Sequence, residues 1–110
     1  MIKIIKQPLS REELNEFVGK PYSEMIKFVV DVQKEILGLG GELHADAEDC
    51  LLKEGSSQAD LWGGNYYPGQ KRIEYGSFIN IRPSVGNRSM EVENEKIKGR
   101  IQAILKKLLP

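Results

Sequence analysis

The chain has 110 residues, of which 40% are hydrophobic and 29% are charged. A chain of this length folds around one core, so we expect a single domain over residues 1–110. The 16 basic residues equal the 16 acidic residues in number. This balance excludes a strong overall field toward nucleic acid or an anionic membrane, so any nucleic-acid contact needs a local basic patch.

Cysteine content and hydropathy indicate where the protein resides. The single cysteine, Cys50, excludes an internal disulfide framework and is typical of a reducing cytoplasm. The apolar start of the chain is interrupted by Lys3 and is too short for a signal peptide. No apolar run approaches the length of a membrane span. We therefore expect a cytoplasmic protein without a membrane partner.

The first third of the chain predicts a strand and two helices. Residues 2–6 have the β-branched composition of a short strand. Ser10 opens a capping-box pattern, and the apolar spacing after it predicts a short helix to about residue 19. Ser23 has the position of a second N-cap. The broad apolar face that follows predicts a longer, buried helix to residue 37, which the glycines of residues 38–41 end.

The remainder of the chain predicts four strands and a helix. The hydrophobic period changes from 3.6 to 2 at residues 41–47, which favours a strand. Further strands are expected at residues 51–54, 60–67 and 73–82, with the last of these the clearest. Asn94 has the position of an N-cap for a final amphipathic helix with a basic outer face.

The order of these elements predicts the fold class. It reads β-α-α-β-β-β-β-α with tight turns in the middle, which is typical of an α+β fold. We expect a single small antiparallel or mixed sheet of four to five strands, with about three helices packed on one face.

A loop rich in hydrogen-bond donors follows the predicted strand 73–82. Its candidate ligand-binding residues are Arg82, Ser84, Asn87, Arg88 and Ser89. Pro83 ends strand pairing and Gly86 permits a positive φ, so successive backbone N–H groups can form a concave anion site. The alternative is a structural connection, in which Asn87 and Ser89 satisfy backbone groups and the arginines pair with local acids.

His44, the only histidine, lies between Glu42 and Asp46. If this segment is a strand, both carboxylates flank the imidazole and favour its protonated form, which suits acid–base catalysis by His44 and Asp46. The same groups, with Asp49 or Cys50, form a weaker pattern for a divalent metal, and we assign no metal ligand. The alternative is an ordinary strand histidine with one hydrogen bond.

Two further features suggest ligand contacts. Trp62, beside glycines and followed by Tyr66 and Tyr67, has the composition of a stacking surface for a flat ligand. Such residues more often fill a core and its edge. The basic face of the final helix can contact nucleic acid, but acidic residues stand close by, so a solvated face is the alternative.

Three segments carry a resemblance to a known family. Residues 41–46 (GELHAD), 60–63 (DLWG) and 80–89 (NIRPSVGNRS) are similar to the landmarks of a family of small prokaryotic proteins catalogued only as a domain of unknown function. The resemblance covers nearly the whole chain, and the last segment is the most specific. It implies a stand-alone prokaryotic protein and supplies no mechanism.

Together these patterns favour a protein that binds a small anionic or phosphorylated ligand between the His44 segment and the Arg82–Arg88 loop. Arg82 and Arg88 would hold the anion, Asn87 would orient it, and His44 with Asp46 would transfer a proton if the protein is an enzyme. The sequence names no cofactor. The alternative is a non-enzymatic module that binds a protein partner, a second copy of itself or nucleic acid through its open sheet face or its basic final helix.

Overall fold

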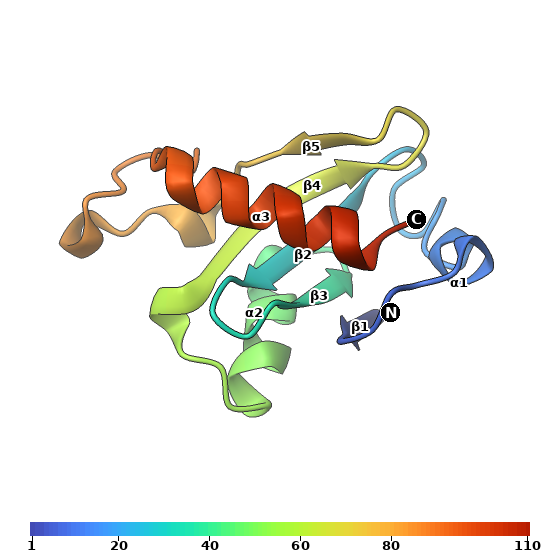
Figure 1. The fold of residues 1–110 in the computed structure, drawn as a ribbon, viewed down its shortest axis with the longest axis horizontal. Helices are drawn as coiled ribbons and strands as arrows, with labels where there is room; N and C mark the ends of the chain where they lie inside the picture. Colours follow the sequence, from blue (N-terminus) through green and yellow to red (C-terminus); the bar gives the residue numbers. More distant parts are fainter.

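The computed structural model describes residues 1–110 and contains one antiparallel sheet in the order β1-β3-β2-β4-β5, together with three α-helices (Figure 1). The strands are β1 (Ile2–Ile5), β2 (Ile26–Asp31), β3 (Ile36–Gly40), β4 (Leu61–Tyr67) and β5 (Arg72–Glu74). The helices are α1 (Arg11–Asn15), α2 (His44–Lys53) and α3 (Glu95–Leu108). The predicted α+β class, with five strands and three helices, is confirmed.

Two of the three predicted N-caps are present, at Ser10 and Asn94, whereas no helix follows Ser23. Asn94 Oδ1 accepts from the backbone N–H groups of Lys96 and Ile97 at 2.9 and 3.1 Å, and so fixes the start of α3. Ser10 and Glu13 form the reciprocal capping box of α1, although α1 ends at Asn15 rather than near residue 19.

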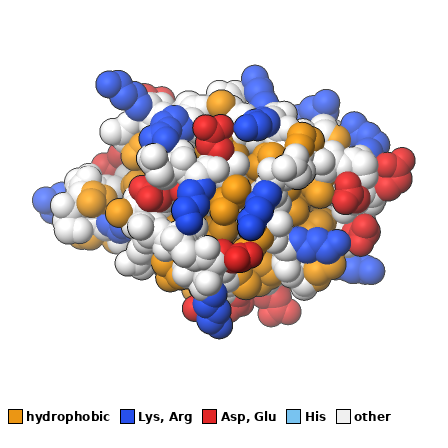
Figure 2. Space-filling view, turned by 60° about the horizontal axis from the view of Figure 1, so that its bottom comes forward, with side chains coloured by type: hydrophobic (Ala, Val, Ile, Leu, Met, Phe, Trp, Pro, Cys, Tyr) orange, Lys and Arg blue, Asp and Glu red, His pale blue; other side chains and the backbone are white.

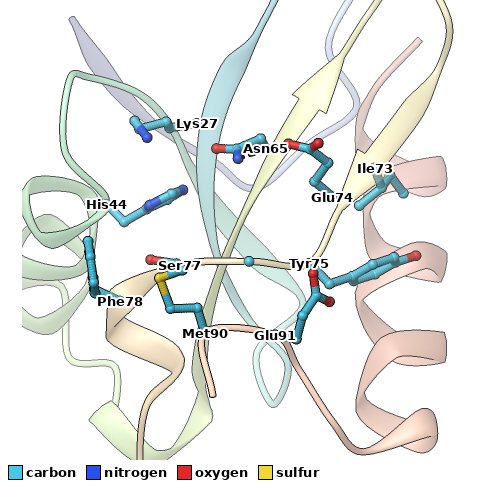
Figure 3. A pocket seen from close by; sticks show the side chains of 11 residues that line it. Lys27, His44, Asn65, Ile73, Glu74, Tyr75, Ser77, Phe78, Met90 and Glu91 are labelled. Carbon is cyan, nitrogen blue, oxygen red and sulfur yellow. Dashed lines mark hydrogen bonds between the residues drawn. The ribbon is translucent and has the colours of Figure 1, made fainter.

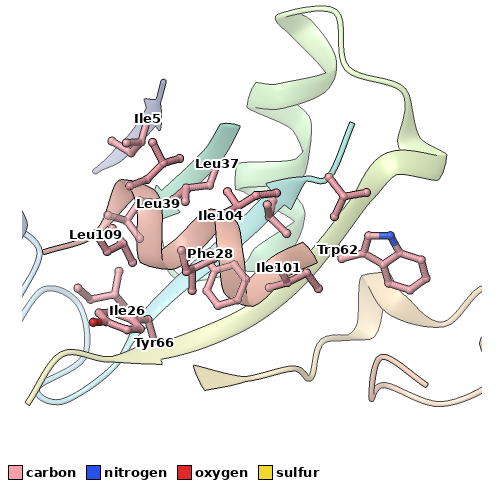
Figure 4. Close-up of a cluster of buried hydrophobic side chains, with 14 of the residues drawn as sticks. Ile5, Ile26, Phe28, Leu37, Leu39, Trp62, Tyr66, Ile101, Ile104 and Leu109 are labelled. Carbon is pink, nitrogen blue, oxygen red and sulfur yellow. The ribbon is translucent and has the colours of Figure 1, made fainter. Parts of the chain in front are cut away.

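The larger core lies between the sheet and α3. Figure 1 shows α3 crossing one face of the sheet, and Figure 4 shows the buried side chains beneath it. The helix contributes Ile101, Ile104, Leu105 and Leu108, and the sheet contributes residues such as Phe28, Leu37, Leu39 and Tyr66. The Cα radius of gyration is 12.7 Å, close to the value of about 13 Å expected of a single compact domain of this length.

A second, smaller core lies on the opposite face of the sheet, beneath α2. It consists of Val29, Ala47, Leu51 and Leu61. The predicted packing of all helices on one face is therefore wrong. The central strand β2 is apolar on both sides, with Val29 toward α2 and its neighbours Phe28 and Val30 toward α3, so each face needs a helical cover.

The long helix predicted over residues 23–37 is instead the hairpin of β2 and β3. A continuous apolar run that is buried on both faces fits helical spacing as well as a central strand, and pairing with neighbouring strands decides the outcome. Asp31 forms the turn: its Oδ1 accepts from the N–H groups of Gln33 and Lys34, each at 2.9 Å. Glu35 completes the turn with a positive φ of 57°.

Two predicted strands are helical instead. The strand predicted at residues 41–47 overlaps the start of α2, and the strand predicted at residues 51–54 overlaps its end. Ala47 and Leu51 are spaced four residues apart, and both are buried against the sheet. This short helical stripe was masked by the alternating polar residues around His44. The element order is therefore β-α-β-β-α-β-β-α rather than the predicted order.

The predicted strand 60–67 is confirmed as β4, but the strand predicted over residues 73–82 is ladder-paired only in β5. Beyond β5 the chain forms isolated bridges at Gly76 and Arg82, with a 3₁₀ turn, Phe78–Asn80, between them. The Ser77 hydroxyl accepts from the N–H of Ile79 at 3.3 Å. Local side-chain bonds of this kind compete with a β ladder, and here they end it.

Candidate functional site

A row of polar side chains crosses the sheet on the face that α2 covers only in part. Lys27 of β2 is paired with Asn65 of β4, and Asn65 is paired with Glu74 of β5. Since residues two apart in a strand share a face, Lys27 and Asn65 lie on the same side as Val29 and Leu61 of the smaller core. The polar row therefore continues the α2 face of the sheet beyond that core.

This row forms the floor of a cavity of about 520 Å³, which we call the groove. Figure 3 shows His44, from the start of α2, and Phe78 on one side of it, with Glu74 and Tyr75 on the other. Met90 and Glu91 border a further side. The volume lies within the range of about 300–1,000 Å³ typical of small-ligand sites.

The His44 ring is oriented by one hydrogen bond. Its Nε2 lies 2.7 Å from the carbonyl oxygen of Gly64 in β4. Because a carbonyl oxygen only accepts, Nε2 carries the hydrogen, and Nδ1 of the neutral ring keeps its lone pair. Burial lowers the pKa of His44 below its usual value of 6.5, Lys27 adds to this effect, and the bond to Gly64 opposes it. The imidazole is thus neutral at pH 7 and available as a base.

The Glu74 carboxylate is the centre of a hydrogen-bond network. Its Oε1 accepts from Asn65 Nδ2 at 3.2 Å and from the Tyr67 hydroxyl at 2.9 Å, while its Oε2 accepts from Arg72 Nη1 at 3.1 Å. These bonds, led by the one from Tyr67, lower the pKa of Glu74 and keep it ionised. A carboxylate cannot donate, so the amide orientation of Asn65 is fixed. Asn65 Oδ1 is left buried and without a partner.

The other predicted catalytic residue, Asp46, lies outside the groove. It is exposed on α2, two residues after His44. Residues two apart on a helix point about 200° apart, so Asp46 does not share the face of His44. The structure therefore separates the two groups that the sequence placed side by side.

Arg82 lies outside the groove lining and contacts the first two residues of β4, Leu61 and Trp62. Its Nη2 lies 3.9 Å from Glu48 Oε2 and donates a hydrogen bond to the carbonyl oxygen of Leu61. Its guanidinium carbon is 4.8 Å from the centre of the Trp62 ring. Burial lowers the pKa of Arg82, and Glu48 opposes that shift. The predicted stacking residue Trp62 is itself only 3% exposed and belongs to the larger core.

Asn87 holds the predicted anion loop together. Its Nδ2 donates to the carbonyl oxygens of Asn80, Ser89 and Glu91 at 2.8–3.0 Å, and its Oδ1 accepts from the N–H of Glu93 at 2.9 Å. All polar atoms of this buried side chain are therefore used inside the loop.

The same loop binds a carboxylate of its own chain. Glu93 Oε2 accepts from the N–H groups of Arg88 and Ser89 and from the Ser89 hydroxyl, at 2.9, 3.0 and 3.0 Å. These bonds lower the pKa of Glu93. The Gly86 φ of 84° that the sequence analysis anticipated is present. Ser84 is exposed in the turn Pro83–Val85, and the structure assigns it no side-chain bond.

Of the catalytic and ligand-binding residues predicted from the sequence, His44 alone lines the groove. Lys27, Asn65 and Glu74 were missed. They come from three different strands, and only the register between those strands brings them together. One signal was available in the sequence: a lysine and an asparagine, each inside an otherwise apolar or glycine-rich strand.

Three further observations concern metal-binding groups, membrane spans and surface charge. The structure contains no group of three or more His, Cys, Asp or Glu side chains placed to hold a metal ion. None of its helices has the length and apolar character needed to cross a membrane. Figure 2 shows Lys, Arg, Asp and Glu side chains interspersed over one face of the molecule, with no large area of a single sign.

The fold and the groove define a small α+β protein with an open, partly polar cavity on its sheet. The chain belongs to the family described as protein of unknown function (DUF5674), whose model matches residues 3–108. The resemblance to a domain of unknown function is therefore confirmed. Neither the curated proteins nor the solved structures contain a match to this chain.

Proposed function

We propose that the protein binds a small ligand in the groove and that His44 accepts a hydrogen bond or a proton from it. The observation that carries this proposal is the state of His44. The ring is held at the wall of a cavity of about 520 Å³, and its Nε2–H is committed to Gly64. An oriented, neutral imidazole beside a cavity is the arrangement required of a general base.

This proposal moves the ligand away from the Arg82–Arg88 loop. An external anion there would have to displace the Glu93 carboxylate from its three hydrogen bonds, and Arg82 already faces Glu48. The hypothesis of an anionic or phosphorylated ligand at that loop remains testable with inorganic phosphate. We expect phosphate to leave the loop signals unchanged.

The test uses NMR spectra of the sole histidine. We expect a titration midpoint below 6.5 for His44 in the free protein, because burial disfavours its charged form. Three probes at millimolar concentration are then compared: 2-phenylethylamine, 3-phenylpropionate and inorganic phosphate. The proposal requires at least one probe to shift the His44 ring signals together with the Asn65 side-chain amide. If none does so, the proposal fails.

Replacing the histidine provides a second readout. His44→Gln keeps a side-chain N–H for the carbonyl of Gly64 but removes the titrating ring. We expect this variant to fold and to bind the active probe more weakly, without the pH dependence that the ring confers. Asp46→Asn is the matched control on the same helix, since Asp46 is exposed and lies outside the groove.

A second candidate function is a protein-interaction module, and one observation favours it. The Phe78 side chain at the groove rim is 79% exposed, and Met90 beside the groove is 46% exposed. Exposed aromatic and methionine side chains are enriched at protein interfaces. A homodimer through this rim predicts a concentration-dependent mass in analytical ultracentrifugation that Phe78→Ser abolishes. A monomer at all concentrations removes the homodimer.

We also infer a reducing, cytoplasmic location in a prokaryotic cell. Cys50 is a free, half-buried thiol, which suits such a compartment, and the family resemblance favours the prokaryotic origin. Immunodetection in fractions of the native cells tests the location. Recovery from an oxidising or extracellular fraction would contradict it.

A further inference from the structure

A second cavity, which we call the pocket, lies on the other face of the sheet. It has a volume of about 310 Å³ and lies between the turn that joins β4 to β5 and the C-terminal half of α3. Tyr66 and Leu105 line it and belong to the larger core, so the pocket is on the α3 face, whereas the groove is on the α2 face. Ile73, at the edge of the sheet, borders both cavities. The pocket is therefore a separate site from the one assigned to His44.

The charged side chains that line the pocket are both basic. They are Lys71, in the turn between β4 and β5, and Lys106, in α3. Neither ammonium group forms an ion pair with a carboxylate of the chain or lies over an aromatic ring. The next residue along the chain does have a carboxylate partner in each case, at 3.1 Å for Arg72 and at 3.7 Å for Lys107. The pocket therefore holds two positive charges that the protein leaves uncompensated.

The backbone of Lys71 has a conformation that favours glycine. Its φ is 51°, in the left-handed region, where a residue with a side chain is less stable than glycine. Glycine would make the same turn at a lower cost in free energy, so the turn itself does not account for a lysine here. Residues held in such conformations cluster at functional sites. This observation favours a role for the Lys71 ammonium group.

The rest of the pocket combines hydrogen-bond donors with apolar surface. The Tyr66 hydroxyl and the Gln102 side-chain amide have no hydrogen-bond partner within the chain. Burial raises the pKa of Tyr66, and Arg11 opposes that shift, so the hydroxyl keeps its hydrogen at neutral pH. Ile73 and Leu109 supply apolar surface. A ligand with an anionic group and a small apolar body would complement both parts.

We infer that the pocket binds a small organic phosphate, with the phosphate between Lys71 and Lys106 and an apolar body against Ile73 and Leu109. A phosphate monoester carries nearly two negative charges at pH 7, which matches two unpaired ammonium groups, whereas a carboxylate would neutralise only one. The volume of about 310 Å³ is at the lower end of the range for small-ligand sites and fits a body of a single ring or a short chain. This inference is independent of the function proposed for the groove.

The test compares three probes in NMR spectra of the full chain: phenyl phosphate, 3-phenylpropionate and inorganic phosphate. We expect phenyl phosphate to shift the Gln102 side-chain amide and the Leu109 methyl signals in a saturable way, with an affinity about tenfold or more above that of either other probe. The His44 ring, which reports on the groove, should not follow the same binding curve. Equal binding of 3-phenylpropionate would overturn the assignment to a phosphate, and equal binding of inorganic phosphate would overturn the apolar body. If no probe binds, the inference fails.

Variants of the two lysines separate recognition from general charge. Lys71→Gly keeps the left-handed turn and Lys106→Gln keeps the helix. Each should weaken the binding of phenyl phosphate about tenfold or more, the effect of losing a hydrogen bond from a charged donor. Lys107→Gln is the matched control, since it removes the same charge from α3 at a residue that lies outside the pocket lining. Unchanged binding in either pocket variant, or an equal loss in Lys107→Gln, would overturn the inference.

Discussion

The side chain of Asn80 takes the place of a neighbouring strand for Gly63. Its Oδ1 accepts from the Gly63 N–H at 2.8 Å, and its Nδ2 donates to the Gly63 carbonyl oxygen at 3.0 Å. The same Nδ2 also donates to the carbonyl of Met90 at 2.9 Å. One fully buried amide thus completes the edge of β4 where β5 has ended, and it ties the segment that carries Met90 to the sheet.

Replacing this amide by a carboxylate should be severely destabilising. Asn80→Asp leaves the carbonyls of Gly63 and Met90 without donors and buries a charge. We expect a loss of about 3 kcal/mol or more in the free energy of unfolding, measured in urea. Asn15→Asp on the exposed face of α1 is the control and should cost little. A small effect of Asn80→Asp would mean that solvent satisfies these carbonyls.

Because of the Glu93 carboxylate, the free energy of unfolding should decrease at acid pH. Its folded pKa is lowered from 4.5 by the bonds from Arg88 and Ser89. The stabilisation is therefore complete above about pH 4.5 and is lost as pH falls through the lowered folded value. Glu93→Gln should be less stable than the unmodified chain near neutral pH, and this difference should shrink on acidification. The measurement is urea unfolding as a function of pH.

A matched carboxylate distinguishes this effect from general acid sensitivity. Glu24 is exposed, and no hydrogen bond or ion pair of its side chain is present in the structure. The difference in free energy of unfolding between Glu24→Gln and the unmodified chain should therefore be the same at every pH. If the difference for Glu93→Gln is also the same at every pH, the loop does not depend on its internal carboxylate, and an external anion becomes the better account of its donors.

The sequence predicted those parts of the fold that local signals determine. The N-cap at Asn94 and the apolar stripe of α3 lie within one helix, and the strand β4 is bounded by its own turn residues. The run from Phe28 to Val32 is different, because central burial removes the alternation that marks a strand. Helical spacing and strand composition then fit the same residues, and only the pairing with β3 and β4 resolves them.

The candidate site was predictable in one residue and not in its surroundings. His44 was predicted as a candidate because it is the only histidine, although it begins a helix rather than lying in a strand. Its hydrogen-bond partner Gly64 comes from β4, and the distance between them depends on how α2 packs across the sheet. The donor-rich loop was predicted to hold an anionic ligand, whereas in the structure its donors bind the Glu93 carboxylate of the same chain.

Arg82 and Glu48 should be energetically coupled. Their side chains are only 12% and 13% exposed, and Arg82 Nη1 and Glu48 Oε2 have no hydrogen-bond partner. Removing one charge leaves the other buried and uncompensated, so we expect Arg82→Met and Glu48→Met each to lose about 3 kcal/mol of stability. The double variant should be less destabilised than the sum of the two by at least about 1 kcal/mol. Additive losses in the double-mutant cycle would show that the two charges do not interact.

Gly64 should be required for the register that builds the groove. A Cβ at this position would lie 2.5 Å from Cζ of Phe28 and would also clash with the backbone oxygen of Glu74. Backbone in a paired strand cannot move without separating β4 from β5, so Gly64→Ala should lose about 1–3 kcal/mol of stability through overpacking. It should also shift the Asn65 amide signal, because Asn65 reaches Glu74 across the same pair of strands. Gly69→Ala is the matched control, since a Cβ there meets nothing within 4 Å. Equal stability of the two variants would show that β5 is free to move away from β4, and the groove floor would then not be a fixed structure.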